Sequence, residues 1–225
     1  MAKISIVVVE DHPLFRQGVI DTLSFDPDFD VIGNSANGDD GLNLILSMQP
    51  DIAILDVNMP GKNGQQITSD VTGSKSVTKV ILMTAFATED QMIHAAIAGA
   101  HGFCSKDILP EELMDLVRTV YKGGYSMNSR LMTEAEFKSW LSEQLTHYSK
   151  VYSDPGNPLH PLSDRELEVL NMIVDGKSNK EIGNALSLSE QTIKNHVTSI
   201  FRKFGVEDRT QAVIYAMKMG WVKII

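Results

Sequence analysis

Two hydrophobic patterns alternate along the first half of the chain. Up to about residue 122, short apolar runs are each followed by 10–16 residues with helical periodicity. The runs are ISIVVV (4–9), DVIGNS (30–35), DIAILD (51–56), KVILMT (79–84) and HGFCSK (101–106). Apolar runs that alternate with helices are typical of a parallel sheet covered on both faces. The pattern predicts an α/β domain at residues 1–124, with a doubly wound five-stranded parallel sheet.

The pattern changes after Gly124. A capping box at Thr133-Glu-Ala-Glu136 precedes apolar residues at helical spacing, which predicts an amphipathic helix over residues 134–148. Residues 153–161 contain three prolines and predict a linker or an ordered turn. Residues 125–160 are therefore interpreted as a connecting segment.

Helical signals alone follow in residues 161–225. The sequences Ser163-Asp-Arg-Glu166 and Ser178-Asn-Lys-Glu181 are capping boxes, and Ser189 is a good N-cap for a helix that runs to about Phe204. A short connection at 186–189 separates the second of these helices from the third. This arrangement predicts an all-α, four-helix domain that contains a helix-turn-helix.

Composition narrows the class of protein. The 225 residues suit two domains, and a single cysteine excludes an internal disulfide. No apolar run is long enough to span a membrane, so we expect a cytoplasmic protein with no membrane partner.

The formal net charge of −9 alone disfavours a nucleic-acid partner. The charge is unevenly divided, however. Residues 1–125 hold 8 Lys+Arg and 17 Asp+Glu, whereas residues 161–225 hold 9 and 8. The acidity therefore belongs to the first domain, and the C-terminal domain is nearly neutral.

Polar side chains stand where the predicted strands end. They are Glu10 and Asp11 after the first strand, Asp56 on the third, Thr84 on the fourth and Lys106 on the fifth. The carboxyl ends of parallel strands meet at one edge of the sheet, so these residues should converge. Three close carboxylates need a cation, and hard oxygen ligands suit Mg²⁺. Asp56 is the best candidate nucleophile toward a phosphoryl group, with Lys106 and Thr84 as donors to its oxygens.

Residues 4–123 resemble the receiver domain of two-component response regulators, which has a flavodoxin-like fold. The resemblance is carried by VVVEDHPLFRQG, DIAILDVNMPGKNG, ILMTA and GFCSKD. It implies that Asp56 accepts a phosphoryl group from a sensor histidine kinase. It also implies a Mg²⁺ site made by Glu10, Asp11, Asp56 and the backbone carbonyl of Asn58, with Thr84 and Lys106 binding the phosphoryl oxygens.

Roles in phosphorylation are also expected for Phe103, Asn58 and Phe86. The resemblance implies that Phe103 turns inward with Thr84 on activation; the alternative is an apolar residue at the edge of the core. Asn58 and Phe86 occupy positions that vary in this family and tune the lifetime of the acyl phosphate. We hypothesise that Phe86 shields the site from water.

The predicted helix near 190–204 has two unlike faces. An apolar stripe contains Ile193, Val197, Ile200, Phe201 and Phe204. We predict DNA contacts by the residues of the opposite face, which are Lys194, Asn195, Thr198, Arg202 and Lys203. The first three suit base edges and the last two suit phosphates. The alternative is a solvated basic face.

Residues 162–216 resemble a LuxR-type helix-turn-helix through LSDRELEVL, SNKEI, LSLSEQTIKNHV and RTQAV. With the receiver in front, the whole chain resembles the NarL/FixJ family of transcriptional response regulators. The resemblance implies that the third helix enters the major groove of double-stranded DNA and that the last helix, about 209–219, mediates dimerisation. A homodimer, formed through that helix or the receiver, would read inverted half-sites. Thr198 departs from members that carry a lysine, which leaves the base preference open.

Two other functions compete with a phosphorylation-controlled regulator. In one, the helix-turn-helix binds another protein instead of DNA. In the other, the carboxylates hydrolyse phosphate esters, with His12 as the only nearby base. His12 suits a helix cap or an exposed position better, so we expect no enzyme.

Overall fold

The computed structural model describes residues 3–74, 76–151, 162–218 and 222. The chain divides into two compact units, Met1–Leu145 and Thr146–Ile225. The proline-bearing segment predicted as a linker, residues 153–161, lies outside the described residues. No helix in the described ranges is long and apolar enough to cross a membrane.

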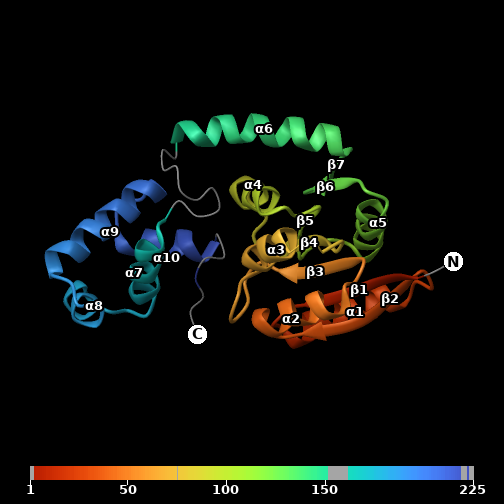
Figure 1. The fold of residues 1–225 in the computed structure, drawn as a ribbon, viewed down its shortest axis with the longest axis horizontal. Coiled ribbons are helices and arrows are strands. Elements are labelled where there is room, and N and C mark those ends of the chain that lie inside the picture. The colour runs from red at the N-terminus through yellow and green to blue at the C-terminus, as the bar shows by residue number, and fades with distance from the viewer. Residues whose placement is uncertain (1–2, 75, 152–161, 219–221, 223–225) are drawn as a thin grey trace. The chain divides into compact units, whose positions relative to one another are not determined.

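A seven-stranded sheet forms the centre of the first unit, with helices on both faces (Figure 1). The strand order is β2-β1-β3-β4-β5-β6-β7. The strands are β1 (Ile4–Val9), β2 (Phe29–Ser35), β3 (Ile52–Asp56), β4 (Lys79–Thr84), β5 (Gly102–Ser105), β6 (Tyr125–Met127) and β7 (Arg130–Met132). All neighbouring strands are parallel except β6 and β7. The first five strands are the predicted ones, in a doubly wound order.

Five helices connect these strands. They are α1 (Pro13–Ser24), α2 (Gly38–Met48), α3 (Gly64–Gly73), α4 (Glu89–Ala98) and α5 (Pro110–Tyr121). Proline opens α1 and α5, where the first turn needs no N–H donor. Asn37, Asn63 and Thr88 cap the other three. Apolar residues of α1 and α5 pack with β1, β3 and β4 in one core cluster, which fixes the sheet against its helices.

A hairpin extends the sheet beyond the five predicted strands. The amide of Ser126 donates to the carbonyl of His101, and the amide of Asn128 donates to that of Phe103. Asn128 and Ser129 take positive φ values of 50° and 68° in the two-residue turn. The prediction of a five-stranded sheet was wrong here because three-residue strands are too short to show periodicity.

Helix α6 (Glu134–Val151) follows the hairpin and extends past the predicted 134–148. Its predicted capping box is present, with Glu136 accepting from the amide and hydroxyl of Thr133. The Tyr125 ring stacks on Phe137 at 4.1 Å and on His101 at 5.1 Å between centroids. Phe137 and Trp140 are buried. The first half of α6 therefore packs on the β5–β6 end of the sheet and belongs to the first unit.

Within the described residues 162–218, the second unit contains four helices: α7 (Asp164–Val174), α8 (Asn179–Leu186), α9 (Glu190–Phe204) and α10 (Arg209–Lys218). Both predicted capping boxes are present, and Ser189 caps α9. Ser187 ends α8 in the left-handed conformation, and the amide of Leu188 returns to the carbonyl of Gly183. This tight turn joins α8 to α9, as the helix-turn-helix prediction requires. Ile193, Ile200 and Phe204 lie in the core of this unit.

Candidate functional site

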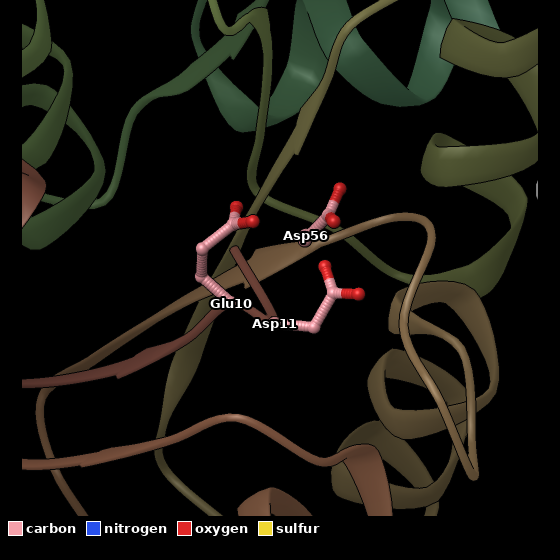
Figure 2. Close-up of side chains that lie close together, drawn as sticks. All are labelled: Glu10, Asp11 and Asp56. Carbon is pink, nitrogen blue, oxygen red and sulfur yellow. The ribbon is translucent and has the colours of Figure 1, made fainter. Parts of the chain in front are cut away.

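Three carboxylates gather at the carboxyl ends of β1 and β3 (Figure 2). Glu10 and Asp56 are buried and Asp11 is half-buried. One oxygen from each lies within 4.8 Å of the others. The backbone amide of His12 donates to Glu10 at 3.0 Å, which fixes the turn that carries both β1 acids. This set of hard oxygen donors fits a Mg²⁺ ion.

Lys106 places its ammonium group among these acids. Its Nζ atom lies 2.7 Å from Glu10 Oε2 and 3.0 Å from Asp56 Oδ2. The Lys106 amide donates to the carbonyl of Thr84 at 2.8 Å, which ties the end of β5 to the end of β4. Burial would lower the pKa of Lys106, but the two carboxylates outweigh it and raise the pKa. Lys106 is therefore a permanent cation next to Asp56.

Asp56 combines burial with nearby charge. Burial and the neighbouring Glu10 carboxylate raise its pKa to about 6, although Lys106 and the Asn58 amide oppose the rise. The amide of Asn58 donates to Asp56 Oδ1 at 3.2 Å. Near pH 7 Asp56 is therefore mostly an ionised carboxylate, which is the form that can act as a nucleophile.

Close backbone contacts hold the loop that follows Asp56. A Cβ atom on Gly64 would lie 2.3 Å from the carbonyl oxygen of Asp56, so only glycine fits there. The amide of Gly38, in the first turn of α2, donates to the carbonyl of Pro60 at 2.9 Å. Gly38 and Gly64 are the first residues of α2 and α3. Backbone packing against these two helix ends therefore sets the position of the loop that contains Asn58.

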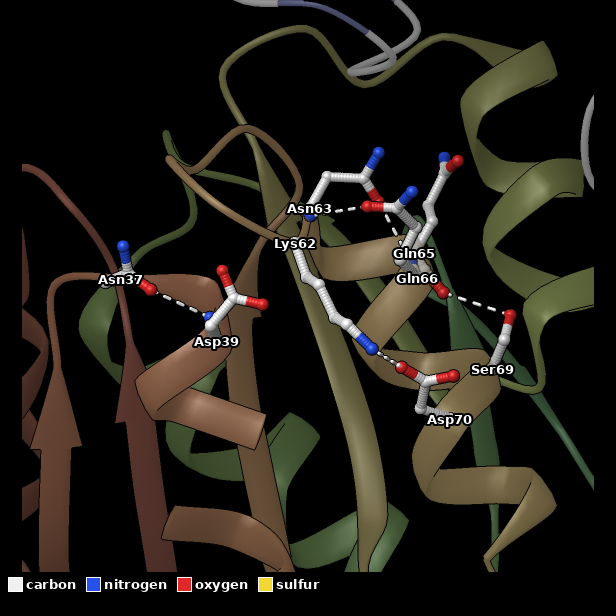
Figure 3. A network of polar contacts seen from close by, with 8 residues as sticks. All are labelled: Asn37, Asp39, Lys62, Asn63, Gln65, Gln66, Ser69 and Asp70. Atoms are coloured by element: carbon white, nitrogen blue, oxygen red, sulfur yellow. Dashed lines mark hydrogen bonds and ion pairs between the residues drawn. The ribbon is translucent and has the colours of Figure 1, made fainter. Parts of the chain in front are cut away.

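Side chains of the same loop stabilise the start of α3 (Figure 3). Asn63 and Gln66 form a reciprocal capping box, and Lys62 pairs with Asp70 one turn further along α3. Asn37, which caps α2, accepts from the amide of Asp39 at 2.8 Å. These contacts order the two helix ends next to the acidic cluster.

The strands β4 and β5 carry the other predicted residues of the site. Thr84 ends β4, Phe86 follows it, and Phe103 lies on β5. Thr84 is fully buried, and its hydroxyl accepts from the amide of Phe86 at 3.2 Å. The Phe86 side chain is 59% exposed, so its shielding role stays a prediction that this conformation does not display. Phe103 is fully buried on β5, between Leu82 and Met127 of the adjoining strands. Full burial fits the alternative of an apolar core residue, and β6 pairs with the far side of β5, so the switch role of Phe103 stays a prediction.

Two residues of the site were missed by sequence reasoning. The ring of Phe15 lies 4.9 Å from the Lys106 ammonium, within the range of a cation–π contact. Arg16 donates from Nη1 to the Glu10 carbonyl at 2.6 Å. The only signal was their place in the first turn of α1, directly after the acids. His12 precedes α1, is exposed, and makes no side-chain cap hydrogen bond.

Helix α9 presents four of the five predicted DNA-contacting residues to solvent: Lys194, Asn195, Thr198 and Arg202. Lys194 pairs with Glu190 at 2.9 Å across one turn, and Gln191 donates to Asn195 at 3.2 Å. The Thr198 hydroxyl donates to the Lys194 carbonyl, which holds its side chain against the helix.

Lys203 is the exception. Its side chain is 18% exposed, and its ammonium lies 2.8 Å from Glu166 on α7. The expectation that Lys203 belongs to the outer face was wrong. It lies four residues after Ser199, and residues four apart on a helix share a face. Both side chains contact Glu166.

Comparison with known proteins agrees with this geometry. Residues 6–118 match the model of the response regulator receiver domain, and residues 160–216 match that of bacterial regulatory proteins of the luxR family. The transcriptional regulatory protein DegU of Brevibacillus brevis is 36% identical over 99% of this chain and 96% of its own length. The oxygen regulatory protein NreC of Staphylococcus aureus MRSA252 is 32% identical over 95% of this chain and 96% of its own.

Solved structures give the same result for the first unit. The signal receiver domain of NarL from Mycobacterium tuberculosis is 36% identical, with a TM-score of 0.54, and covers 55% of this chain and 99% of its own. Both domains match family models, and the relatives align over nearly the full length of the chain, so the family of the whole chain is established. The chain belongs to the NarL/FixJ family of two-component response regulators, which are DNA-binding transcription regulators with a receiver domain and a LuxR-type helix-turn-helix domain.

Proposed function

We propose that Asp56 is the phosphoacceptor of this regulator and that its donor is a phosphohistidine of a sensor kinase. The observation that carries the proposal is the Lys106 ammonium 3.0 Å from Asp56, in a cluster with two further carboxylates. Lysine neutralises charge on an incoming phosphoryl group and keeps Asp56 ionised at neutral pH.

The transfer needs one bond made and one broken. A carboxylate oxygen of Asp56 attacks phosphorus, and the phosphorus–nitrogen bond to the imidazole breaks. The imidazole nitrogen keeps the electron pair and takes a proton from solvent. The Thr84 hydroxyl and the Lys106 ammonium then donate to the phosphoryl oxygens.

Glu10, Asp11, Asp56 and the Asn58 backbone carbonyl would hold Mg²⁺. When bound, the ion supplies positive charge that offsets the carboxylates and draws in the phosphoryl oxygens. The Asn58 amide, which donates to Asp56, orients the carboxylate for attack. Phe103, buried beside Leu82, would adjust with Thr84 when the phosphoryl group arrives.

The second unit would read double-stranded DNA through α9. Lys194, Asn195 and Thr198 are exposed on the amino-terminal half of the helix, where base edges are read, and Arg202 suits a phosphate. A homodimer through α10, where Ile214 is 49% exposed, or through the receiver would place two α9 helices on inverted half-sites. Phosphorylation would shift a pre-existing equilibrium toward the DNA-binding form.

Intact-mass measurement tests the phosphoacceptor. The parent protein, incubated with Mg²⁺ and a small phosphodonor, should gain one phosphoryl group, and Asp56→Asn should gain none. Asp107→Asn is the matched control, because Asp107 is an exposed carboxylate one residue after Lys106. Equal phosphorylation of Asp56→Asn would refute the assignment, and repeated turnover of a phosphomonoester would favour an enzyme.

A further inference from the structure

Glu166 lies in the first turn of α7 and is 5% exposed, and its carboxylate is shared between two helices. Oε2 accepts from the amide and hydroxyl of Ser163, at 2.7 and 2.8 Å, and so closes the N-terminal cap of α7. The same oxygen lies 2.8 Å from the Lys203 ammonium, and Oε1 accepts from the Ser199 hydroxyl at 2.7 Å. One buried carboxylate therefore bonds α7 to α9 at two points.

Two contacts with Glu166 restrict the rotation of α9 more than a single contact would. Ser199 and Lys203 are one turn apart on the same flank of α9, so fixing both opposes rotation of the helix about its axis. Ile193 and Ile200 anchor the adjoining flank in the core. The rotation of α9 decides which side chains face outward, and these are the residues that would contact base edges.

Arg165, the residue before Glu166, contacts α8, the other helix of the helix-turn-helix. Arg165 donates from Nη2 to the carbonyl of Leu186, the last residue of α8, at 3.0 Å. A Cβ atom on Gly183 would lie 2.8 Å from the Leu188 carbonyl, so α8 approaches the turn closely. Two consecutive residues of α7 thus hold the end of α8 and the flank of α9.

We infer that Glu166 is a positioning residue that fixes the orientation of α9 through Ser199 and Lys203, and that Lys203 does not neutralise a DNA phosphate. The inference rests on the proposed DNA-binding function. A lysine whose ammonium is held by a buried carboxylate has little charge to offer a phosphate, whereas Arg202, its exposed neighbour, keeps its charge available.

The test compares Lys203→Met with Arg202→Met in the full-length protein. The probe is a duplex selected from a random pool by the parent, with a scrambled duplex of equal composition as the non-specific reference. The slope of log affinity against log salt should fall by about 1 in Arg202→Met, which loses a phosphate contact, and stay unchanged in Lys203→Met. Lys203→Met should instead lose about tenfold in the ratio of selected to scrambled affinity, the size of one lost base-pair contact.

A double-mutant cycle separates positioning from simple loss of stability. Glu166→Gln and Lys203→Met should each lower the affinity ratio, and the double variant should be no worse than the poorer single variant. All affinities are measured where denaturation curves show that each variant is fully folded. Should Lys203→Met fail to fold, Ser199→Ala removes one of the two α9 bonds and should lower the ratio at an unchanged salt slope.

A salt slope that falls by about 1 in Lys203→Met, or additive losses in the double variant, would overturn the inference. If the parent binds no duplex at all, the proposed function fails instead. Denaturant unfolding then still tests the pairing itself, because independent effects of Glu166→Gln and Lys203→Met on stability would refute it.

Discussion

Glu166→Gln removes one negative charge from the junction of α7 and α9 and keeps the shape of the side chain. Burial would raise the pKa of Glu166, but the Lys203 ammonium and the Ser163 and Ser199 donors lower it from 4.5 to about 2. Each unit of difference between the pKa in the folded and the unfolded chain corresponds to about 1.4 kcal/mol. The ionised carboxylate therefore contributes about 3 kcal/mol to the stability of the second unit.

The sign follows from the lowered pKa. The contribution is complete above the pKa of the unfolded chain, near 4.5, and is lost as pH falls toward about 2. The stability difference between parent and Glu166→Gln should therefore be nearly constant between pH 7 and 5. It should shrink by about 3 kcal/mol as the pH approaches 2.

Denaturant unfolding at several pH values, followed by the methyl NMR signals of Ile182 and Ile193, reports on the second unit separately. Glu168→Gln is the control, because Glu168 is exposed and pairs with Arg165 on the same helix. It should change stability by about 0.5 kcal/mol or less. A stability difference for Glu166→Gln that does not depend on pH between 5 and 2 would refute the reasoning.

Two further substitutions test the first unit. Lys106→Met removes the cation that lowers the pKa of Asp56, so the pH of half-maximal phosphorylation should rise. Lys62→Met, which removes a partly exposed lysine of the following loop that pairs with Asp70, should leave that pH unchanged. An unchanged pH profile in Lys106→Met would contradict the pairing. Gly64→Ala forces a Cβ atom against the backbone of Asp56 and should lower stability by about 1–3 kcal/mol and weaken Mg²⁺ binding measured by calorimetry. Gly73→Ala, where a Cβ atom meets nothing within 4 Å, is its control, and equal effects of the two would refute the packing argument.

The acidic cluster can be predicted from the sequence because the topology of the sheet determines which residues share an edge. Once five apolar runs are assigned to one parallel sheet, the residues after β1 and at the ends of β3 and β5 must share an edge. The structure brings Glu10, Asp11, Asp56 and Lys106 together there. Phe15 was missed because its contact with Lys106 depends on how closely α1 approaches β5, which no spacing along the chain encodes.

The two other differences also have physical causes. The β6–β7 hairpin has three residues per strand and an Asn128-Ser129 turn in place of the common Asn-Gly, so both of its signals are weak. Lys203 was assigned to the outer face by its charge. Its helical position, four residues after Ser199 and directly before the buried Phe204, places it on a flank that faces α7.

The central claim is that phosphorylation of Asp56 controls DNA binding by the second unit. The most direct test is the affinity of the full-length protein for its selected duplex, with and without a small phosphodonor and Mg²⁺. Phosphorylation should tighten binding by roughly 5- to 150-fold, the usual range for coupled sites, and Asp56→Asn should not respond. Equal affinity of the phosphorylated and unphosphorylated protein, or an equal response of Asp56→Asn, would contradict the account.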